Sequence, residues 1–217
     1  MARLFTYYSM MQIARGNLTL ALECQETINR LRKALDGLTG FDREYFLNQE
    51  LSPVKQKLDN YCLITIVFSA FAVEGYIYDY AARKLTDNFV EKHLNRLSVL
   101  SKLIVVTKLV TGKDFPKEGK AFKLIKQLIE NRNSIVHSKS TNLLKPDDEI
   151  NLSGQESSED IRELLHTQGA KNLFAFANSI LDSAKDSITA IDELATVMKS
   201  LDREESYAFI LAEKTDS

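Results

Sequence analysis

Apolar residues recur at helical spacing along most of the chain. In residues 11–35, apolar side chains approximate one helix face, and the sequence DGLTG supplies a stop. That face carries Leu20, Ile28, Leu31 and Leu35. The pattern predicts a first long helix, followed by a connector with a single helical turn.

The next helix is predicted from Val54 to Leu85. Pro53 suits the first position of a helix, where its missing N–H has no intrahelical partner to lose. Asn60 is a place where this helix could be interrupted. The stretch LITIVF has strand-like composition, but no turn signals flank it and no similar strand could pair with it. A buried helix is therefore the better interpretation.

Three further helices are predicted in the middle of the chain. LTDNFVEKHLNRLS is short and polar, with Asp87 as a cap. VLSKLIVVTKLVTG is apolar and ends at Gly112. A helix from Lys117 to about Ser138 follows.

The C-terminal third begins with a polar stretch without periodicity, which predicts an exposed loop. A final long helix is predicted from about Ser158 to Met198, with a break considered at Gly169. We therefore expect an all-α protein, an antiparallel bundle of about five helices with an extra N-terminal helix. The expected division is residues 1–50 for that helix and its connector, 51–200 for the bundle and 201–217 for a polar tail.

Composition is that of a folded, soluble protein: 44% of the 217 residues are apolar and 27% charged. Cys24 and Cys62 lack the paired spacing of a zinc or redox motif, which favours free core thiols in a reducing compartment. The N-terminus does not resemble a secretory signal. The longest apolar stretch, residues 61–73, is shorter than the roughly 20 residues that cross a bilayer. We expect a cytoplasmic protein without a membrane span, metal or cofactor.

Charge is distributed unevenly, although the net charge is only −2. Residues 101–145 hold 10 basic and 3 acidic residues, whereas residues 146–217 hold 6 and 16. A local positive field would attract a polyanion such as RNA. The candidate RNA-binding lysines are Lys120, Lys123, Lys126 and Lys139. These lysines could instead be solvated side chains on a helix surface, or be shielded by the acidic C-terminal block.

Arg132 interrupts an apolar stripe of the helix predicted at residues 117–138. The stripe consists of Phe122, Ile125, Ile129 and Val136. Burying an unpaired guanidinium is costly, so Arg132 needs an anionic partner, a route to solvent or an anionic ligand. A snorkelling or ion-paired arginine remains a structural alternative.

Asn133 and His137 lie four residues apart and are therefore neighbours on the same helix. His137 could titrate near neutral pH, which suits a general acid or base. It could equally be a structural histidine stabilised by the C-terminal end of the helix dipole. The other two histidines, His93 and His166, look like surface positions.

Glu74 also falls within an apolar face, three residues after Phe71 and four before Tyr78. A buried carboxylate needs a cationic or hydrogen-bonding partner, and Arg132 is a candidate. The pair could be purely structural, or Glu74 could support a catalytic Arg132.

Together, these features resemble the HEPN superfamily. Its signature is an arginine, four to six residues and a histidine, often with a polar residue after the arginine. Here it stands as Arg132, Asn133, Ser134, Ile135, Val136, His137, with an acidic residue in an earlier core helix. The similarity covers roughly residues 55–200, and the first 50 residues show no counterpart.

The resemblance implies a metal-independent endoribonuclease that acts as a homodimer, with two motifs facing one another across a cleft. His137 would transfer a proton, Arg132 would hold the scissile phosphate and Asn133 would orient one of them. Members commonly serve as toxins of toxin–antitoxin pairs or as antiphage (antiviral) defence effectors, often with a nucleotidyltransferase partner.

Two alternatives remain. Some members of the superfamily have lost catalysis, so the chain could be a non-catalytic helical interaction module, in which the Glu74 and Arg132 charges form a core pair. It could also bind RNA or a nucleotide without cleavage, in which case binding would weaken steeply with salt.

Overall fold

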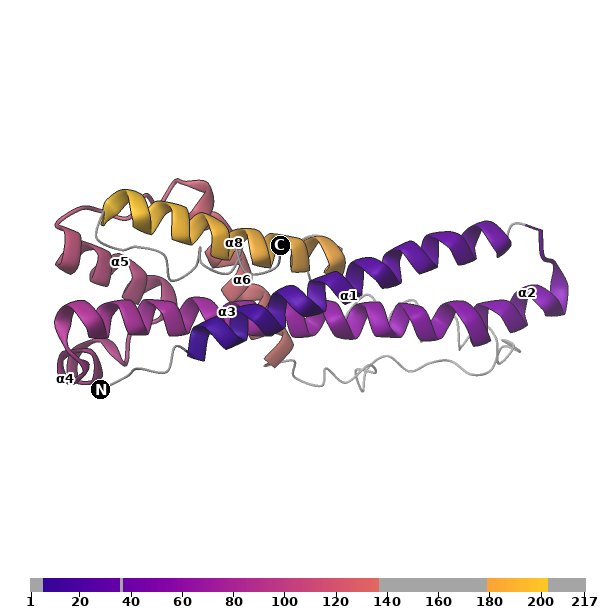
Figure 1. Ribbon diagram of the computed structural model, residues 1–217, viewed down its shortest axis with the longest axis horizontal. Helices are drawn as coiled ribbons and strands as arrows, with labels where there is room; N and C mark the ends of the chain where they lie inside the picture. The colour runs from indigo at the N-terminus through magenta and orange to yellow at the C-terminus, as the bar shows by residue number, and fades with distance from the viewer. Residues whose placement is uncertain (1–5, 36, 137–178, 203–217) are drawn as a thin grey trace, which may run out of the picture.

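The computed structural model describes residues 6–35, 37–136 and 179–202. The predicted all-α class is confirmed, because the described residues form packed helices and no strand. Figure 1 shows the arrangement. The elements are α1 (Thr6–Leu35), α2 (Gly40–Phe46), the π-helical η1 (Leu47–Leu51), α3 (Ser52–Leu85), α4 (Asp87–Phe89), the π-helical η2 (Val90–Leu94), α5 (Val99–Thr111), α6 (Lys120–Val136) and α8 (Ile180–Leu201).

The two longest helices, α1 and α3, form an antiparallel pair with a seven-residue repeat of buried positions (Figure 1). This spacing keeps one stripe of each helix facing its partner, as in a coiled coil. The repeat consists of Tyr7, Ala14, Ala21, Ile28 and Leu35 in α1, and of Leu51 at the end of η1 followed by Leu58, Thr65 and Ala72 in α3. The expectation that Leu20 belongs to the core face of α1 is wrong, because Leu20 lies off this stripe and is 39% exposed.

Small residues set how closely α1 approaches α3. The Thr65 hydroxyl lies 3.3 Å from the carbonyl oxygen of Ala14, which fixes the register of the pair. A Cβ atom at Gly75 would come within 3.0 Å of the Cβ of Tyr7, so only glycine fits there without a shift. α1 begins at Thr6, earlier than predicted, because Tyr7 and Met11 still pack into the core.

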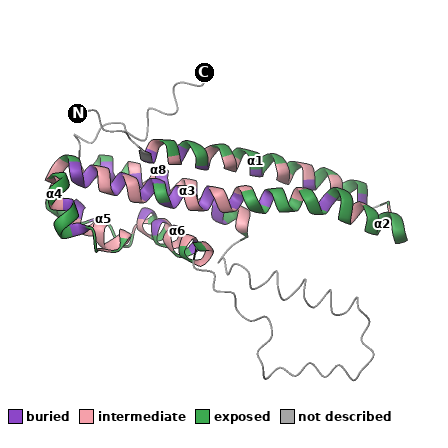
Figure 2. Ribbon diagram, turned by 90° about the horizontal axis from the view of Figure 1, so that it is seen from below, coloured by how far each residue is buried: buried purple, intermediate pink, exposed green. Residues whose placement is uncertain are grey.

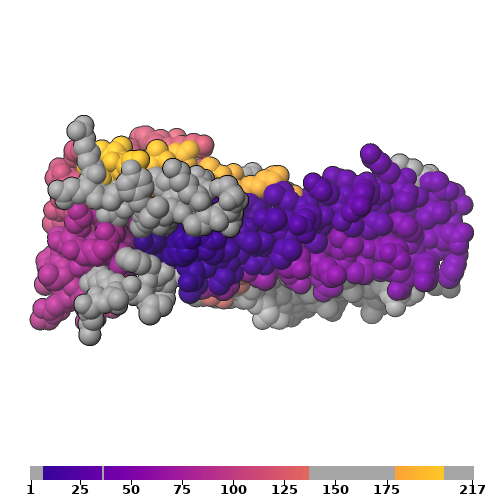
Figure 3. All heavy atoms as spheres, in the orientation of Figure 1, coloured from indigo at the N-terminus to yellow at the C-terminus, as the bar shows by residue number. Residues whose placement is uncertain are grey.

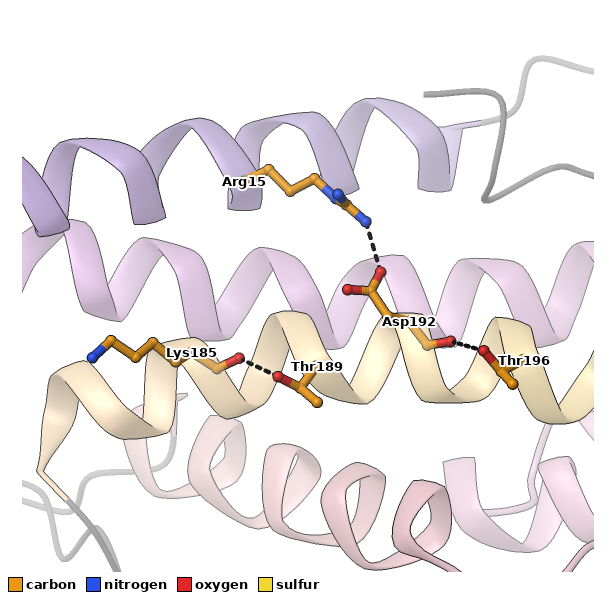
Figure 4. Close-up of polar contacts among 5 residues, drawn as sticks. All are labelled: Arg15, Lys185, Thr189, Asp192 and Thr196. Atoms are coloured by element: carbon orange, nitrogen blue, oxygen red, sulfur yellow. Dashed lines mark hydrogen bonds and ion pairs between the residues drawn. The ribbon is translucent and has the colours of Figure 1, made fainter. Parts of the chain in front are cut away.

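Helices α6 and α8 pack on α3 and on each other, which completes the core. The packing face of α8 includes Ser183, Ala184, Ser187 and Ala190, whose short side chains allow close approach. Figure 4 shows Arg15 of α1 reaching across to Asp192 of α8 in an ion pair of 2.6 Å. The same view shows the hydroxyls of Thr189 and Thr196 donating to carbonyl oxygens one turn earlier along α8.

The α1–α3 pair extends beyond the other described helices at the end that carries α2 (Figures 1 and 3). No residue of α2 is buried, and the rings of Phe41 and Tyr45 lie on its surface. At the opposite end, α4, η2 and α5 close the bundle. Buried residues of α1 and α3 belong to one core, while the expected domain boundary at residue 50 stays a prediction.

Several helix boundaries in the structure differ from those predicted from the sequence. α3 is continuous through Asn60, where an interruption was considered. Thr86, not Asp87, caps α4: its hydroxyl accepts from the backbone N–H of Phe89, and its φ of 85° ends α3. Gly112 ends α5 in the left-handed conformation, as predicted.

The final helix is shorter than expected in the described chain. Ser179 is non-helical and caps α8 by accepting from the backbone N–H of Asp182, so the helix predicted from Ser158 does not continue unbroken to Met198. The predicted loop at 138–158, the possible break at Gly169 and the tail after Asp202 lie outside the described residues.

One continuous helical stretch, Gly40–Leu85, is long and apolar enough to cross a membrane by length and composition alone. Half of its most apolar window is buried inside the protein. A core helix of a soluble protein passes the same test, so the cytoplasmic location stays a prediction.

Candidate functional site: the Arg132–Glu74 pair at the end of α6

Helix α6 presents one face to the core and ends beside α3 (Figure 2). Its buried residues are Ala121, Ile125, Leu128 and Asn131. Arg132 follows four residues after Leu128 and so continues this face into the last turn. The predicted stripe is therefore only partly right: Ile125 is buried, Phe122 and Ile129 are half-buried, and Val136 is 52% exposed.

Arg132 pairs with Glu74 of α3, as the sequence suggested. Nη2 of Arg132 donates to Oε1 of Glu74. The two side chains are 18% and 33% exposed, so both charges are partly withdrawn from water. Among the described residues, the buried Nε of Arg132 has no hydrogen-bond partner.

This geometry gives the guanidinium a fixed position without using all its donors. A guanidinium has five N–H donors in a planar fork that matches a phosphate. Glu74 holds one edge of Arg132, which limits its rotamers while other donors remain. The pair can therefore serve as an oriented phosphate contact or as a structural ion pair between α3 and α6.

A neighbouring polar contact was missed by the sequence interpretation. Nε2 of Gln127 donates to Oδ1 of Asn131 at 2.9 Å, and Asn131 is buried directly before Arg132. The helical period places Asn131 three residues after Leu128, so its burial could have been predicted from spacing. The amide contact stabilises the turn that carries Arg132.

Of the other two motif residues, only Asn133 lies within the described residues, and it is not brought to Arg132. Asn133 is exposed, and a one-residue step turns it about 100° around the helix from Arg132. His137 directly follows the last residue of α6 and lies outside the described residues. His93 is exposed, as predicted, with its ring 4.9 Å from that of Phe89; His166 lies outside the described residues.

The candidate RNA-binding lysines of α6 are exposed but differ in their partners. Lys120 forms an ion pair of 2.8 Å with Glu193 of α8, and Lys126 approaches Glu130 at 3.9 Å. Lys123 is exposed on the same helix, and Lys139 lies outside the described residues. The alternative that the acidic C-terminal block shields these lysines therefore applies at Lys120, which pairs with Glu193.

The two cysteines are free thiols, as expected. Cys62 is fully buried in the core and Cys24 is partly buried. Burial, followed by the nearby charges of Asp59 and Cys24, raises the pKa of the Cys62 thiol to about 12. Cys62 is therefore a packing residue and not a nucleophile.

No cluster of His, Cys, Asp and Glu that could hold a metal occurs within the described residues. The resemblance to the HEPN superfamily rests on the residues quoted above. Comparison of the chain with protein-family models, with curated proteins and with solved structures found no match in any of the three.

Proposed function

We propose that the protein is a metal-independent endoribonuclease of the HEPN type. The observation that carries the proposal is the Arg132–Glu74 pair, which holds a guanidinium in the last turn of α6. His137 follows that turn in the sequence, at the spacing of the motif. The expected roles as a toxin or antiphage effector, with a nucleotidyltransferase partner, belong to the same proposal.

The proposed reaction uses the 2′-hydroxyl of RNA as its own nucleophile. The 2′-oxygen forms a bond to phosphorus and the bond to the 5′-oxygen breaks, which leaves a 2′,3′-cyclic phosphate and a 5′-hydroxyl. His137 transfers the proton, Arg132 stabilises the charge on the phosphorane oxygens, and Asn133 orients the reacting groups. Glu74 keeps the guanidinium in place.

The test is cleavage of total RNA in EDTA by wild type, Arg132→Ala and His137→Ala. We expect wild type to cleave and both variants to lose at least about 100-fold in rate, since each removes a transition-state contact. Asn95→Ala, an exposed residue far from the motif in sequence, is the matched control and should keep full activity. Circular dichroism checks that each variant is folded.

The second candidate is a non-catalytic interaction module, and the ion pair itself favours it. If the pair is structural, Arg132→Ala lowers stability and wild type does not cleave RNA. If wild type binds RNA without cleaving it, and binding weakens steeply with salt, the protein is an RNA binder. Either outcome contradicts the ribonuclease proposal.

A further inference from the structure

We draw no further inference here: the strongest candidate, the stacked and exposed rings of Phe41 and Tyr45 on α2, at the end where the α1–α3 pair extends beyond the other described helices, carries nothing, because no residue that the structure describes shows what covers them.

Discussion

Arg132 carries a charge into the face of α6 that packs toward the core, and Glu74 meets it there. At the scale of single residues, each partly buried charge is tolerated because the opposite charge of its partner offsets the cost of desolvation. An exposed ion pair contributes about 0.2–1 kcal/mol, and breaking a fully buried one costs about 3–5 kcal/mol. With exposures of 18% and 33%, this pair lies between the two cases.

A double-mutant cycle measures the pair directly. We expect Arg132→Ala and Glu74→Ala each to lower the free energy of unfolding, and the double variant to lose less than the sum. The coupling should be about 1–2 kcal/mol, because the charges are only partly desolvated. Urea unfolding followed by circular dichroism gives the values. Strictly additive losses would show that the contact contributes no stability.

The thiols should differ in reactivity. Because the pKa of Cys62 is raised to about 12, its thiol stays protonated at mildly alkaline pH and should not react with an aromatic disulfide reagent. One thiol per native chain should react rapidly, and Cys24→Ser should abolish that reaction. The rate at which Cys62 reacts with the reagent should rise as the pH approaches 12, because more of its thiol is then deprotonated. Rapid reaction of two native thiols would contradict this prediction; both should react after unfolding in guanidinium chloride.

At the scale of elements, the α1–α3 seam is a seven-residue repeat that is hard to see in the sequence. Two of its α1 positions are alanines and one of its α3 positions is threonine, so apolar bulk does not mark them. Leu20 and Leu22 are larger but lie off the seam. Periodicity predicted the helices themselves. The stripe along which α1 and α3 contact one another depends instead on small residues, which allow the two helices to approach closely.

Substitutions on and off the seam test this assignment. Ile28→Ala removes a fully buried side chain and should lower the free energy of unfolding by about 2–4 kcal/mol. Leu20→Ala, on the same helix but exposed, should change it by less than about 1 kcal/mol. Chemical denaturation measures both. Equal losses at the two positions would contradict the heptad register.

At the scale of the whole molecule, the basic and acidic blocks of the chain meet. Glu193 of α8 neutralises Lys120 of α6, so the positive surface is smaller than the sequence count implies. Asp192, the residue before Glu193 on α8, pairs instead with Arg15 of α1 and so links these two helices. Partial shielding reduces, but does not remove, the attraction of α6 for a polyanion.

Freeing Lys120 should therefore strengthen RNA binding. Glu193→Gln should steepen the slope of log K against log salt by roughly 0.7, the value for one additional contact with single-stranded RNA. The control is Asp192→Asn, which changes the net charge by the same amount but breaks the ion pair with Arg15 and leaves the Lys120–Glu193 pair in place. Fluorescence anisotropy with a labelled RNA gives both slopes. Equal slopes in the two variants would mean that only net charge matters.

The sequence by itself determined the all-α class, most helix positions and the Arg132–Glu74 candidate pair. These follow from local periodicity and from the high free energy of an unpaired charge among apolar residues. Both patterns can be recognised in a single amino-acid sequence. The tertiary structure decided that α3 remains unbroken, that Thr86 and Ser179 act as caps, and that Glu193 forms an ion pair with Lys120. Those outcomes depend on which helices pack together and how closely, and packing between distant segments leaves no local pattern in the sequence.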